Sequence, residues 1–441
     1  MKKILVLGAG FVARPLVNFL QTFDDLELSV TGLTVAEARA VTGEHPRSSA
    51  LAANIDDAAA ILELIRQHDV VMSLLPFDFH VKVARLCIEA GRPMVTTSYA
   101  REDIHALDAA ARDKGILILM EMGLDPGIDH MSAMRVIDRE RAAGGRIVSF
   151  KSSCGGIPAP DADTNPWHYK FSWSPRGVLA ASKSGARYLD AGRVVEVPNR
   201  DMPGHTWEMK IGDMQLEAYP NRDSLPYIDY YHLEGIETMV RCTLRYPGWV
   251  RSFQSLNRLG LLDETSLSRN GEVSNRQMLR RILSVPEDTV LEEYITEEDG
   301  HETTLLRQLQ WLGATRDDVL QPMPDDASPL VFLMHLMIDT MQYSEGERDM
   351  VVLNHDFISE IDGRRKKITS TLVEYGEPGG SSAMSRTVGL PAAIACRLLV
   401  DGKIPLHGVH IPVRPEIYNP VLDILAEKKI ICHDREEWLS F

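Results

Sequence analysis

The stretch KILVLGAGFVA, residues 3–13, decides the fold of this 441-residue chain. Its apolar run leads into Gly8 and Gly10, and Ala13 completes a G-x-G-x-x-A pattern. In a strand–turn–helix unit, the first glycine permits a tight turn and the second lets the backbone approach a pyrophosphate. The small third residue lets the helix pack on the strand. A glycine turn without a ligand is the alternative, but a series of strands and helices in the right order favours a dinucleotide site.

Strand and helix patterns alternate through the first 120 residues. Apolar runs predict strands at 3–9, 26–33, 69–75, 93–98 and 116–120, and helical patterns lie at 11–23, 35–42, 55–67, 79–91 and 104–115. Strands that are apolar on both faces and separated by helices are typical of a parallel sheet covered on both sides. We therefore predict an α/β fold with a Rossmann-type, doubly wound parallel sheet in residues 1–128.

The pattern changes after about residue 146. RIVSFKSSCGG (146–156) resembles a strand followed by a Gly-rich loop, and short strand patterns recur near 192–218 and 238–247. Residues 253–343 are mostly helical in pattern. Strands return at 348–357 and 366–375, which we expect to pair antiparallel around the turn IDGRR. Helices should follow at about 383–400 and 419–432. These patterns predict a mixed α/β substrate domain (129–250 and 346–389) carrying an all-helical insertion (251–345).

Composition limits the partners. The net charge of −16 argues against nucleic acid, which needs clustered basic residues. No apolar run approaches the roughly 20 residues of a membrane helix. The N-terminal apolar run breaks into glycines and has no cleavage site of the signal-peptide kind, so we expect a cytoplasmic protein without a membrane partner. The five cysteines show no metal or disulfide spacing, so we expect reduced thiols and no metal site.

The ends of the predicted strands should hold the cofactor, because ligands of such sheets bind outside the carboxyl ends of the strands. After the second strand, an acid would indicate NAD and an arginine NADP, but TGLTV (31–35) offers neither, which leaves both cofactors open. The predicted cofactor contacts are Gly8, Gly10, Phe11, Val12, Ala13, Leu33, Thr34, Asp56, Leu75, Pro76, Thr97, Ser98 and Leu124.

The stretch GLDPGIDH (123–130) follows the fifth predicted strand and combines glycines, a proline, aspartates and a histidine. The glycines and Pro126 should turn the chain away from the sheet and leave Asp125 at the crevice. Asp125 also suits the N-cap of the next helix, with proline at its first position. Both roles can hold together. We expect His130 to be a packed histidine.

Further candidates lie in the second part of the chain. The long segment 152–177 is rich in glycine, proline and aromatic residues, which is typical of a functional loop. Within it, Cys154 could act as a weak acid or base, although inert packing is the ordinary fate of a lone cysteine. Arg222 in YPNRDS and Arg245 in CTLRYPG could each bind a carboxylate. A surface ion pair is the commoner role of an arginine.

Together these motifs resemble a known family. VLGAGFVARP, VVMSLLPFDFH, VTTSYA, GLDPGIDHMSA, CGGIPAP, NPWHYKFSWSPRGVL, YPNRDS, TLRYPG and TSTLVEYG occur in this order and look like saccharopine dehydrogenase of the L-glutamate-forming type. The resemblance covers nearly the whole chain and is weakest at about 250–340. It implies a Rossmann domain completed by about 390–441, a substrate domain and a helical insertion.

The resemblance also implies a reaction. The family interconverts saccharopine with L-glutamate and 2-aminoadipate 6-semialdehyde, using NADP, in lysine metabolism. Fungal members carry an arginine in a C-R-T triplet after the second strand, where this chain has Leu33, so NADP or NAD remains open. Matched by motif, the implied substrate contacts are Ser98, Tyr99, Asp125, Trp173, Arg222, Thr243, Leu244 and Arg245.

Oxidation of a secondary amine needs a group that moves protons near working pH. Asp125, Tyr99 and Cys154 are the candidate acid/base residues. Asp125 ranks first, although a hydrogen bond to the substrate amine would explain it equally well. Two alternatives remain: a related condensation of another amine and aldehyde, as in carboxynorspermidine-type enzymes, and a non-catalytic dinucleotide-binding protein. An exposed strand pair near 350–375 could form a homodimer.

Overall fold

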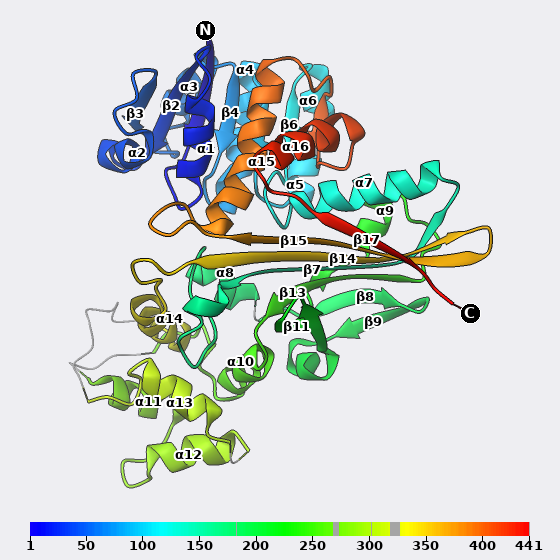
Figure 1. Ribbon diagram of the computed structural model, residues 1–441. Coiled ribbons are helices and arrows are strands. Elements are labelled where there is room, and N and C mark those ends of the chain that lie inside the picture. Colours follow the sequence, from blue (N-terminus) through cyan, green and yellow to red (C-terminus); the bar gives the residue numbers. More distant parts are fainter. Residues whose placement is uncertain (182, 268–272, 301, 318–326, 441) are drawn as a thin grey trace. The chain divides into compact units, whose positions relative to one another are not determined.

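The apolar run before Gly8 forms strand β1 (Lys2–Leu7), near the middle of a seven-stranded parallel sheet in the computed structural model (Figure 1). The strand order is β16–β6–β5–β4–β1–β2–β3. The order reverses between β1 and β4, which is the switch point where Rossmann sheets bind their ligand. The predicted doubly wound sheet is therefore confirmed.

The structure describes residues 1–181, 183–267, 273–300, 302–317 and 327–440. The chain divides into two units, which we describe separately. Unit 1 comprises Met1–Cys154, Ile228–Ile236 and Val351–Phe441, and unit 2 comprises Gly155–Tyr227 and Glu237–Met350.

The Rossmann part of unit 1 alternates strands and helices as the sequence predicts. Its strands after β1 are β2 (Leu26–Gly32), β3 (Ser48–Ala52), β4 (Val70–Ser73), β5 (Met94–Thr96), β6 (Leu117–Leu119) and β16 (Gly408–His410). Its helices are α1 (Ala13–Gln21), α2 (Val35–Thr42), α3 (Ala58–Arg66), η1 (Phe77–Phe79), α4 (His80–Ala90), α5 (Glu102–His105), α6 (Asp108–Asp113), α7 (Ile128–Ala142), α15 (Ala383–Val400) and α16 (Pro415–Glu427).

Helix α15 packs directly on α1, as Figure 1 shows. Gly389 permits this approach, because a Cβ atom there would lie 2.7 Å from the carbonyl oxygen of Val12. Helix α15 is also the one described helix that is long and apolar enough to cross a membrane, and 72% of that window is buried inside the protein. Such burial is expected of a core helix in this position.

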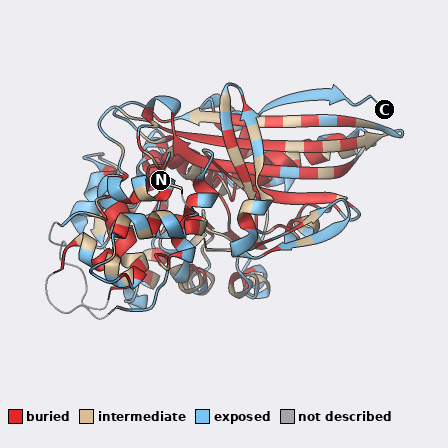
Figure 2. Ribbon diagram, turned by 90° about the horizontal axis from the view of Figure 1, so that it is seen from below, coloured by how far each residue is buried: buried red, intermediate tan, exposed pale blue. Residues whose placement is uncertain are grey.

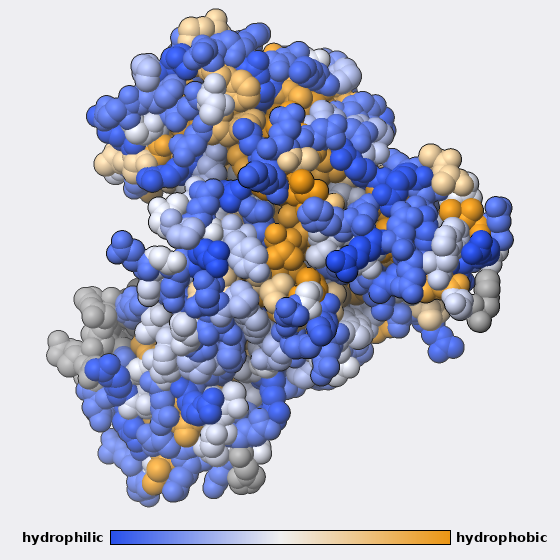
Figure 3. All heavy atoms as spheres, in the orientation of Figure 1, coloured by the Kyte–Doolittle hydropathy of each residue, from blue (hydrophilic) through white to orange (hydrophobic). Residues whose placement is uncertain are grey.

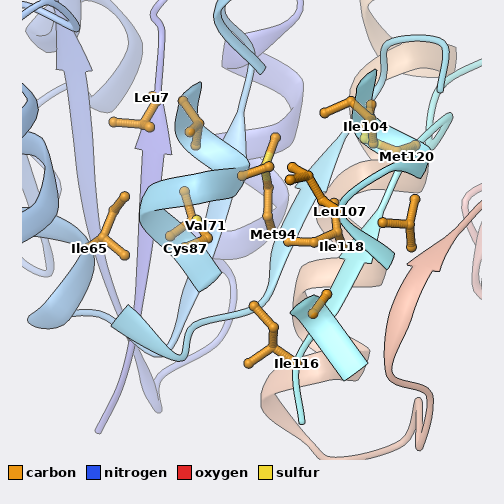
Figure 4. Packing of buried hydrophobic residues seen from close by; sticks show 14 of the residues in the cluster. Leu7, Ile65, Val71, Cys87, Met94, Ile104, Leu107, Ile116, Ile118 and Met120 are labelled. Carbon is orange, nitrogen blue, oxygen red and sulfur yellow. The ribbon is translucent and has the colours of Figure 1, made fainter. Parts of the chain in front are cut away.

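On a face of the sheet, aliphatic side chains from the strands meet those of the covering helices (Figure 4). Leu7, Val71 and Ile118 of the strands and Ile65 and Cys87 of the helices are at most 1% exposed. Removing apolar area from water at this scale is the main stabilising contribution to folding. This packing holds the strands in place, including their carboxyl ends, where a ligand of such a sheet binds.

A ten-stranded sheet contains the run β7–β14–β15–β17, whose strands lie mostly in unit 1: β7 (Arg146–Pro158), β14 (Asp349–Ile361), β15 (Arg364–Tyr375) and β17 (His433–Trp438). The turn between β14 and β15 has Asp362 at φ 49° and Gly363 at φ 74°, as a tight hairpin requires. This confirms the expected pair around IDGRR. Strand β17 is exposed along its length (Figure 2), whereas β14 is largely buried.

Unit 2 contains its own strands and the helical middle of the chain. Its strands are β8 (Ala186–Asp190), β9 (Arg193–Val197), β10 (Trp207–Ile211), β11 (Met214–Pro220), β12 (Arg222–Asp223) and β13 (Thr238–Arg245). Its helices are η2 (Pro160–Ala162), α8 (Pro175–Ala181), η3 (Asn199–His205), α10 (Trp249–Arg258), α11 (Asn275–Leu283), α12 (Leu291–Glu298), α13 (Thr304–Trp311) and α14 (Pro329–Thr340), and α9 (Pro226–Tyr230) runs from unit 2 into unit 1. The three-domain division predicted from the sequence stays a prediction.

Several expectations about single elements are wrong. Strands β3, β16 and β17 were not predicted, and the helix expected at 104–115 is two short helices, α5 and α6. The expected Gly-rich loop after Cys154 continues strand β7 instead. The pair β14–β15 is not an exposed pair, because β14 is buried and β17 covers the free edge of β15. The surface is mostly hydrophilic on the face shown in Figure 3, as the net charge suggests.

Candidate functional site

The turn between β1 and α1 has the geometry of a pyrophosphate cradle. Gly8 has φ 108°, and a Cβ atom there would lie 3.1 Å from the carbonyl oxygen of Leu74. A Cβ atom on Gly10 would meet nothing within 4 Å, so the backbone there is open to a ligand. Ala13 is fully buried and Val12 is the N-cap of α1, while Phe11 is 76% exposed. The residues therefore fit a dinucleotide phosphate at a helix N-terminus.

The other predicted cofactor contacts lie at the carboxyl ends of neighbouring parallel strands. Thr34 caps α2 by accepting a hydrogen bond from the backbone of Glu37. Asp56 pairs with Lys82 of α4 at 3.3 Å. In a parallel sheet these ends share one edge, so the structure brings the predicted set together in unit 1. Leu33 and Thr34 follow β2, Asp56 follows β3, Leu75 and Pro76 follow β4, Thr97 and Ser98 follow β5, and Leu124 follows β6.

Ser98 is held by a buried histidine that the sequence analysis did not assign. His80 Nε2 lies 2.7 Å from Ser98 Oγ, and His80 Nδ1 lies 3.0 Å from Ser73 Oγ. Burial lowers the pKa of His80 to about 4, so the ring is neutral at physiological pH. A neutral ring has one donor and one acceptor nitrogen, which suits two hydroxyl partners. His80 ends the stretch VVMSLLPFDFH, which also contains Ser73, but Ser98 follows the next strand, so the sequence did not indicate that the three side chains meet.

Glu121 holds the same loop from the other side. Its backbone N–H donates to Ser98 O at 3.0 Å, and its carboxylate accepts from the Ala100 N–H at 2.8 Å. Its second oxygen lies 2.7 Å from His130 Nε2, and His130 Nδ1 lies 2.6 Å from the Tyr231 hydroxyl. His130 is completely buried, so the expectation of a packed histidine is confirmed. These contacts fix the loop that carries Ser98, Tyr99 and Ala100.

Asp125 faces Tyr99 and does not cap the next helix. The Tyr99 hydroxyl donates to Asp125 Oδ1 at 3.3 Å. Helix α7 begins at Ile128 with Gly127 as its N-cap, so the expected capping role of Asp125 is wrong. Gly127 takes that position because the chain closes on itself, with Gly123 N–H donating to Pro126 O at 2.9 Å. A Cβ atom on Gly127 would lie 2.0 Å from Gly123 O, so only glycine fits this turn.

Cys154 lies within strand β7 and not in a Gly-rich loop. Its side chain is 7% exposed. The next residue, Gly155, already belongs to unit 2, and a Cβ atom on it would lie 2.4 Å from Leu244 O. The glycine is therefore needed for close packing of strands, which the sequence pattern did not distinguish from a loop.

Arg245 is a buried cation in unit 2. Its guanidinium carbon lies 5.0 Å from the Tyr169 ring centre and 5.4 Å from that of Trp249. Arg245 Nη1 donates to Leu244 O at 2.7 Å, while Nε is buried with no hydrogen-bond partner among the described residues. A buried guanidinium N–H without a hydrogen-bond acceptor is unusual in a folded protein. It fits a site that binds an anionic ligand.

The other predicted contacts on this part of unit 2 surround Arg245. Trp173 Nε1 donates to the Tyr169 hydroxyl at 3.1 Å, and Gly177 leaves room for its ring. Thr243 lies opposite Tyr219 in the antiparallel pair of β11 and β13. The Leu244 side chain is completely buried. Burial raises the pKa of Tyr169 and Tyr219, so both hydroxyls stay protonated.

Arg222 lies elsewhere on unit 2. It is exposed, has φ 53°, and lines a surface depression of about 440 Å³ beside the ion pair of Arg187 and Asp223. Its neighbour Asn221 hydrogen-bonds to Arg241 on β13, four residues before Arg245. Four strand residues span about 13 Å. The backbones of the two arginines are therefore separated by roughly this distance.

The fold and the cradle define a class first: a Rossmann-fold protein whose glycine turn and strand ends form a dinucleotide site. The comparisons then give the family. Residues 4–119 match the model of the saccharopine dehydrogenase NADP binding domain, and residues 123–431 match that of the saccharopine dehydrogenase C-terminal domain. The chain belongs to the saccharopine dehydrogenase family, as the motifs indicated.

Relatives of nearly equal length agree. The chain is 37% identical over 438 residues to saccharopine dehydrogenase [NADP(+), L-glutamate-forming] of Saccharomyces cerevisiae, covering 97% of each chain. It is 35% identical over 454 residues to the Schizosaccharomyces pombe protein of the same name, covering 98% of each. A solved structure of the L-Glu-forming enzyme from Saccharomyces cerevisiae matches with a TM-score of 0.91 and 35% identity, covering 99% of this chain and 100% of that one.

Proposed function

We propose that this chain is an L-glutamate-forming saccharopine dehydrogenase. It is an NAD(P)-dependent oxidoreductase acting on a CH–NH bond, and it works in lysine metabolism. The observation that carries this proposal is the near-complete, 35–37% identical match to fungal enzymes of that name. Two features of the geometry also support it: the open backbone at Gly10 and the hydrogen bond between Tyr99 and Asp125.

The reaction starts from a secondary amine that carries three carboxylates. A bound NADP or NAD would supply the acceptor for the hydride that leaves the carbon beside the nitrogen. The amine proton goes to a base, which leaves an imine. Water adds to the imine carbon, and the C–N bond then breaks to give the aldehyde and the amino group of glutamate. The net change releases one proton, and the reverse sequence is a reductive condensation.

The chain's own residues have three tasks in this sequence. The strand-end loops of unit 1 position the dinucleotide. Alignment of the nicotinamide with the reacting C–H bond contributes strongly to the rate. Asp125 accepts the amine proton and returns a proton when the carbinolamine collapses, while Tyr99 orients its carboxylate. Cys154 is the third candidate for this proton transfer. His80 and Glu121 keep the Ser98–Tyr99 loop in place through the hydrogen bonds described above.

The substrate carboxylates are assigned to the arginines. Arg245 is held between two aromatic rings with an unsatisfied donor, so it is prepared to bind one carboxylate without ordering its own side chain. Arg222, about 13 Å further along the strand direction, would bind a different carboxylate of the same elongated molecule. Trp173, Thr243 and Ser98 are assigned to its remaining contacts.

The experiment is an assay of reduced-cofactor formation with saccharopine, repeated with the Asp125→Asn variant. We expect saccharopine-dependent reduction by the natural chain and a loss of 10²–10⁴-fold in kcat for the variant, the usual contribution of a general base. Cofactor binding by the variant, followed by fluorescence, should be unchanged. If the chain turned over only carboxynorspermidine-type substrates, the assignment of saccharopine as substrate would be wrong. If it turned over no amine, the result would support the non-catalytic alternative.

We also propose a cytoplasmic location, with small molecules as the ligands: saccharopine, glutamate and aminoadipate semialdehyde. The sequence left a homodimer as one possibility, but the strand pair near 350–375 on which it relied is not exposed. Light scattering on the purified protein would measure the mass directly, and a value equal to one chain would contradict the dimer.

A further inference from the structure

An acidic side chain lies at the end of β2, although the residues just after this strand contain none. Glu37, in the first turn of α2, folds back so that its Oε2 accepts a hydrogen bond from the Leu33 N–H at 3.0 Å. The Glu37 N–H in turn donates to Thr34 Oγ1 at 3.2 Å. The carboxylate is therefore held beside Leu33, the position where an arginine would bind a 2′-phosphate.

Gly32, the last residue of β2, makes this geometry possible. A Cβ atom on Gly32 would lie 3.0 Å from Glu37 Cβ and 3.1 Å from Glu37 Oε2. Any larger residue would press on the folded-back side chain. The strand end and the first turn of α2 are thus built to bring a carboxylate to this edge of the sheet.

The neighbouring charges leave Glu37 without a cation. Among the described residues it forms no ion pair, and it uses only Oε2 in the hydrogen bond to Leu33. Arg39 of the same helix pairs with Glu44, and the Arg14 guanidinium donates to Ala40 O at 2.7 Å. Leu33 is 79% exposed and offers a phosphate neither charge nor hydrogen bond.

In Rossmann sheets an acid after the second strand accepts hydrogen bonds from the adenosine ribose hydroxyls, whereas NADP needs an arginine there for its 2′-phosphate. A fixed carboxylate would also repel that phosphate, because like charges brought together without screening are costly. We propose that Glu37 determines cofactor selectivity and that the chain uses NAD in preference to NADP. This goes against the NADP in the name of the family's domain, and it rests on the proposed function only in requiring that a dinucleotide binds.

The test is binding without substrate. NADH and NADPH are titrated separately against the purified chain at equal ionic strength, with their fluorescence as the signal. We expect NADH to bind about tenfold or more tightly than NADPH. Glu37→Gln keeps an oxygen for the Leu33 N–H but removes the charge, so it should bring the two affinities together by about tenfold. Adding Leu33→Arg to Glu37→Gln should favour NADPH.

The matched control is Glu44→Gln at the other end of α2, which removes one negative charge and should leave the ratio unchanged. Thermal unfolding of each variant checks that the fold is intact. Equal or tighter binding of NADPH by the natural chain would overturn the proposal, and loss of that binding in Arg14→Ala would identify Arg14 as the phosphate ligand instead. Because saccharopine is absent, a clear NADH preference would stand even if the chain failed to oxidise saccharopine.

Discussion

Arg245 shows how one residue can be prepared for a ligand by its surroundings. Its side chain is 5% exposed and contacts the faces of Tyr169 and Trp249. Rings stabilise a cation through their quadrupole, but they leave the N–H groups of the guanidinium unsatisfied. A carboxylate of the substrate would accept those hydrogen bonds, which would explain why a charged side chain is buried here.

Replacing Arg245 with lysine should therefore weaken substrate binding more than catalysis. Lysine keeps the charge but loses the planar fork, and a hydrogen bond to a charged group contributes about 1.5–3 kcal/mol, or roughly 10–100-fold. We expect the KM for saccharopine to rise by that factor with a smaller change in kcat. The control is Arg251→Lys, an exposed arginine of the same unit that pairs with Glu302. An unchanged KM in a folded Arg245→Lys variant would remove this residue from the site.

His80 makes the stability of unit 1 depend on pH. Burial lowers the pKa of His80 from 6.5 to about 4. Between these two values the unfolded chain binds a proton that the folded chain does not. The native state therefore loses stability as pH falls from about 6.5 towards 4, by roughly 3 kcal/mol at full effect.

The His80→Asn variant should reduce this pH dependence, because asparagine keeps a donor and an acceptor but does not titrate. Urea unfolding at about pH 7 and about pH 4.5 gives the free energy of unfolding at each pH. The difference between the two pH values should be smaller in His80→Asn than in the natural chain. His433→Asn, at an exposed position of β17, serves as the comparison. Equal differences in all three proteins would contradict the account of His80.

The candidate residues could be predicted from the sequence where a motif marks them. Gly8, Gly10 and Ala13 belong to one short pattern, and Asp125 and Arg245 lie in motifs of the family. The roles of His80, Glu121 and Tyr231 were not predicted, because their contacts depend on the fold and follow no local pattern. Ser98 lies 18 residues after His80, and Tyr231 lies 101 residues after His130. Glu37 carried a signal that went unused: T-x-x-E from Thr34 is a capping-box pattern, which turns the glutamate back towards the start of the helix.

At the scale of elements, the cap of a helix shows which of two neighbouring acidic residues stabilises the helix and which is available for a ligand. Asp57 caps α3, its side chain accepting from the Ala60 N–H at 3.0 Å. Its neighbour Asp56 instead pairs with Lys82 on the surface and belongs to the predicted cofactor contacts. Two adjacent aspartates thus have different tasks, although the sequence presents them alike.

These two aspartates form a matched pair for mutation. Asp57→Ala should lower the free energy of unfolding by about 1 kcal/mol, the usual value of an N-cap, with little effect on cofactor affinity. Asp56→Ala should change stability by less than about 0.5 kcal/mol, as expected of an exposed ion pair, and should weaken dinucleotide binding. Urea unfolding and NADH titration measure the two quantities. The reverse pattern would show that the assignments are exchanged.

The elements that could be predicted are those with strong local patterns. Strands β1 and β4 follow strongly apolar runs, and the start of α2 was predicted at Val35, where it is observed. Strand β3 was missed because SSALA is short and only half-buried, and β17 because HDREEW is fully exposed. Gly155 was predicted to lie in a loop, because its close contact with Leu244 in the sheet cannot be seen in the local sequence.

At the scale of the molecule, the chain builds the dinucleotide edge from distant parts of the sequence. Strand β16 pairs with β6, and α15 packs on α1 at Gly389, so residues near the C-terminus complete the sheet that the N-terminus begins. The resemblance to the family predicted this return, but the apolar pattern did not.

The measurement that tests the central claim most directly is identification of the products formed from saccharopine and oxidised cofactor. Mass spectrometry of the reaction mixture distinguishes which C–N bond is broken. The account predicts glutamate and 2-aminoadipate 6-semialdehyde, one of each for every cofactor reduced. Lysine and 2-oxoglutarate would show that the other C–N bond is cleaved, and unchanged saccharopine would show that the chain does not catalyse this reaction; either result would contradict the account.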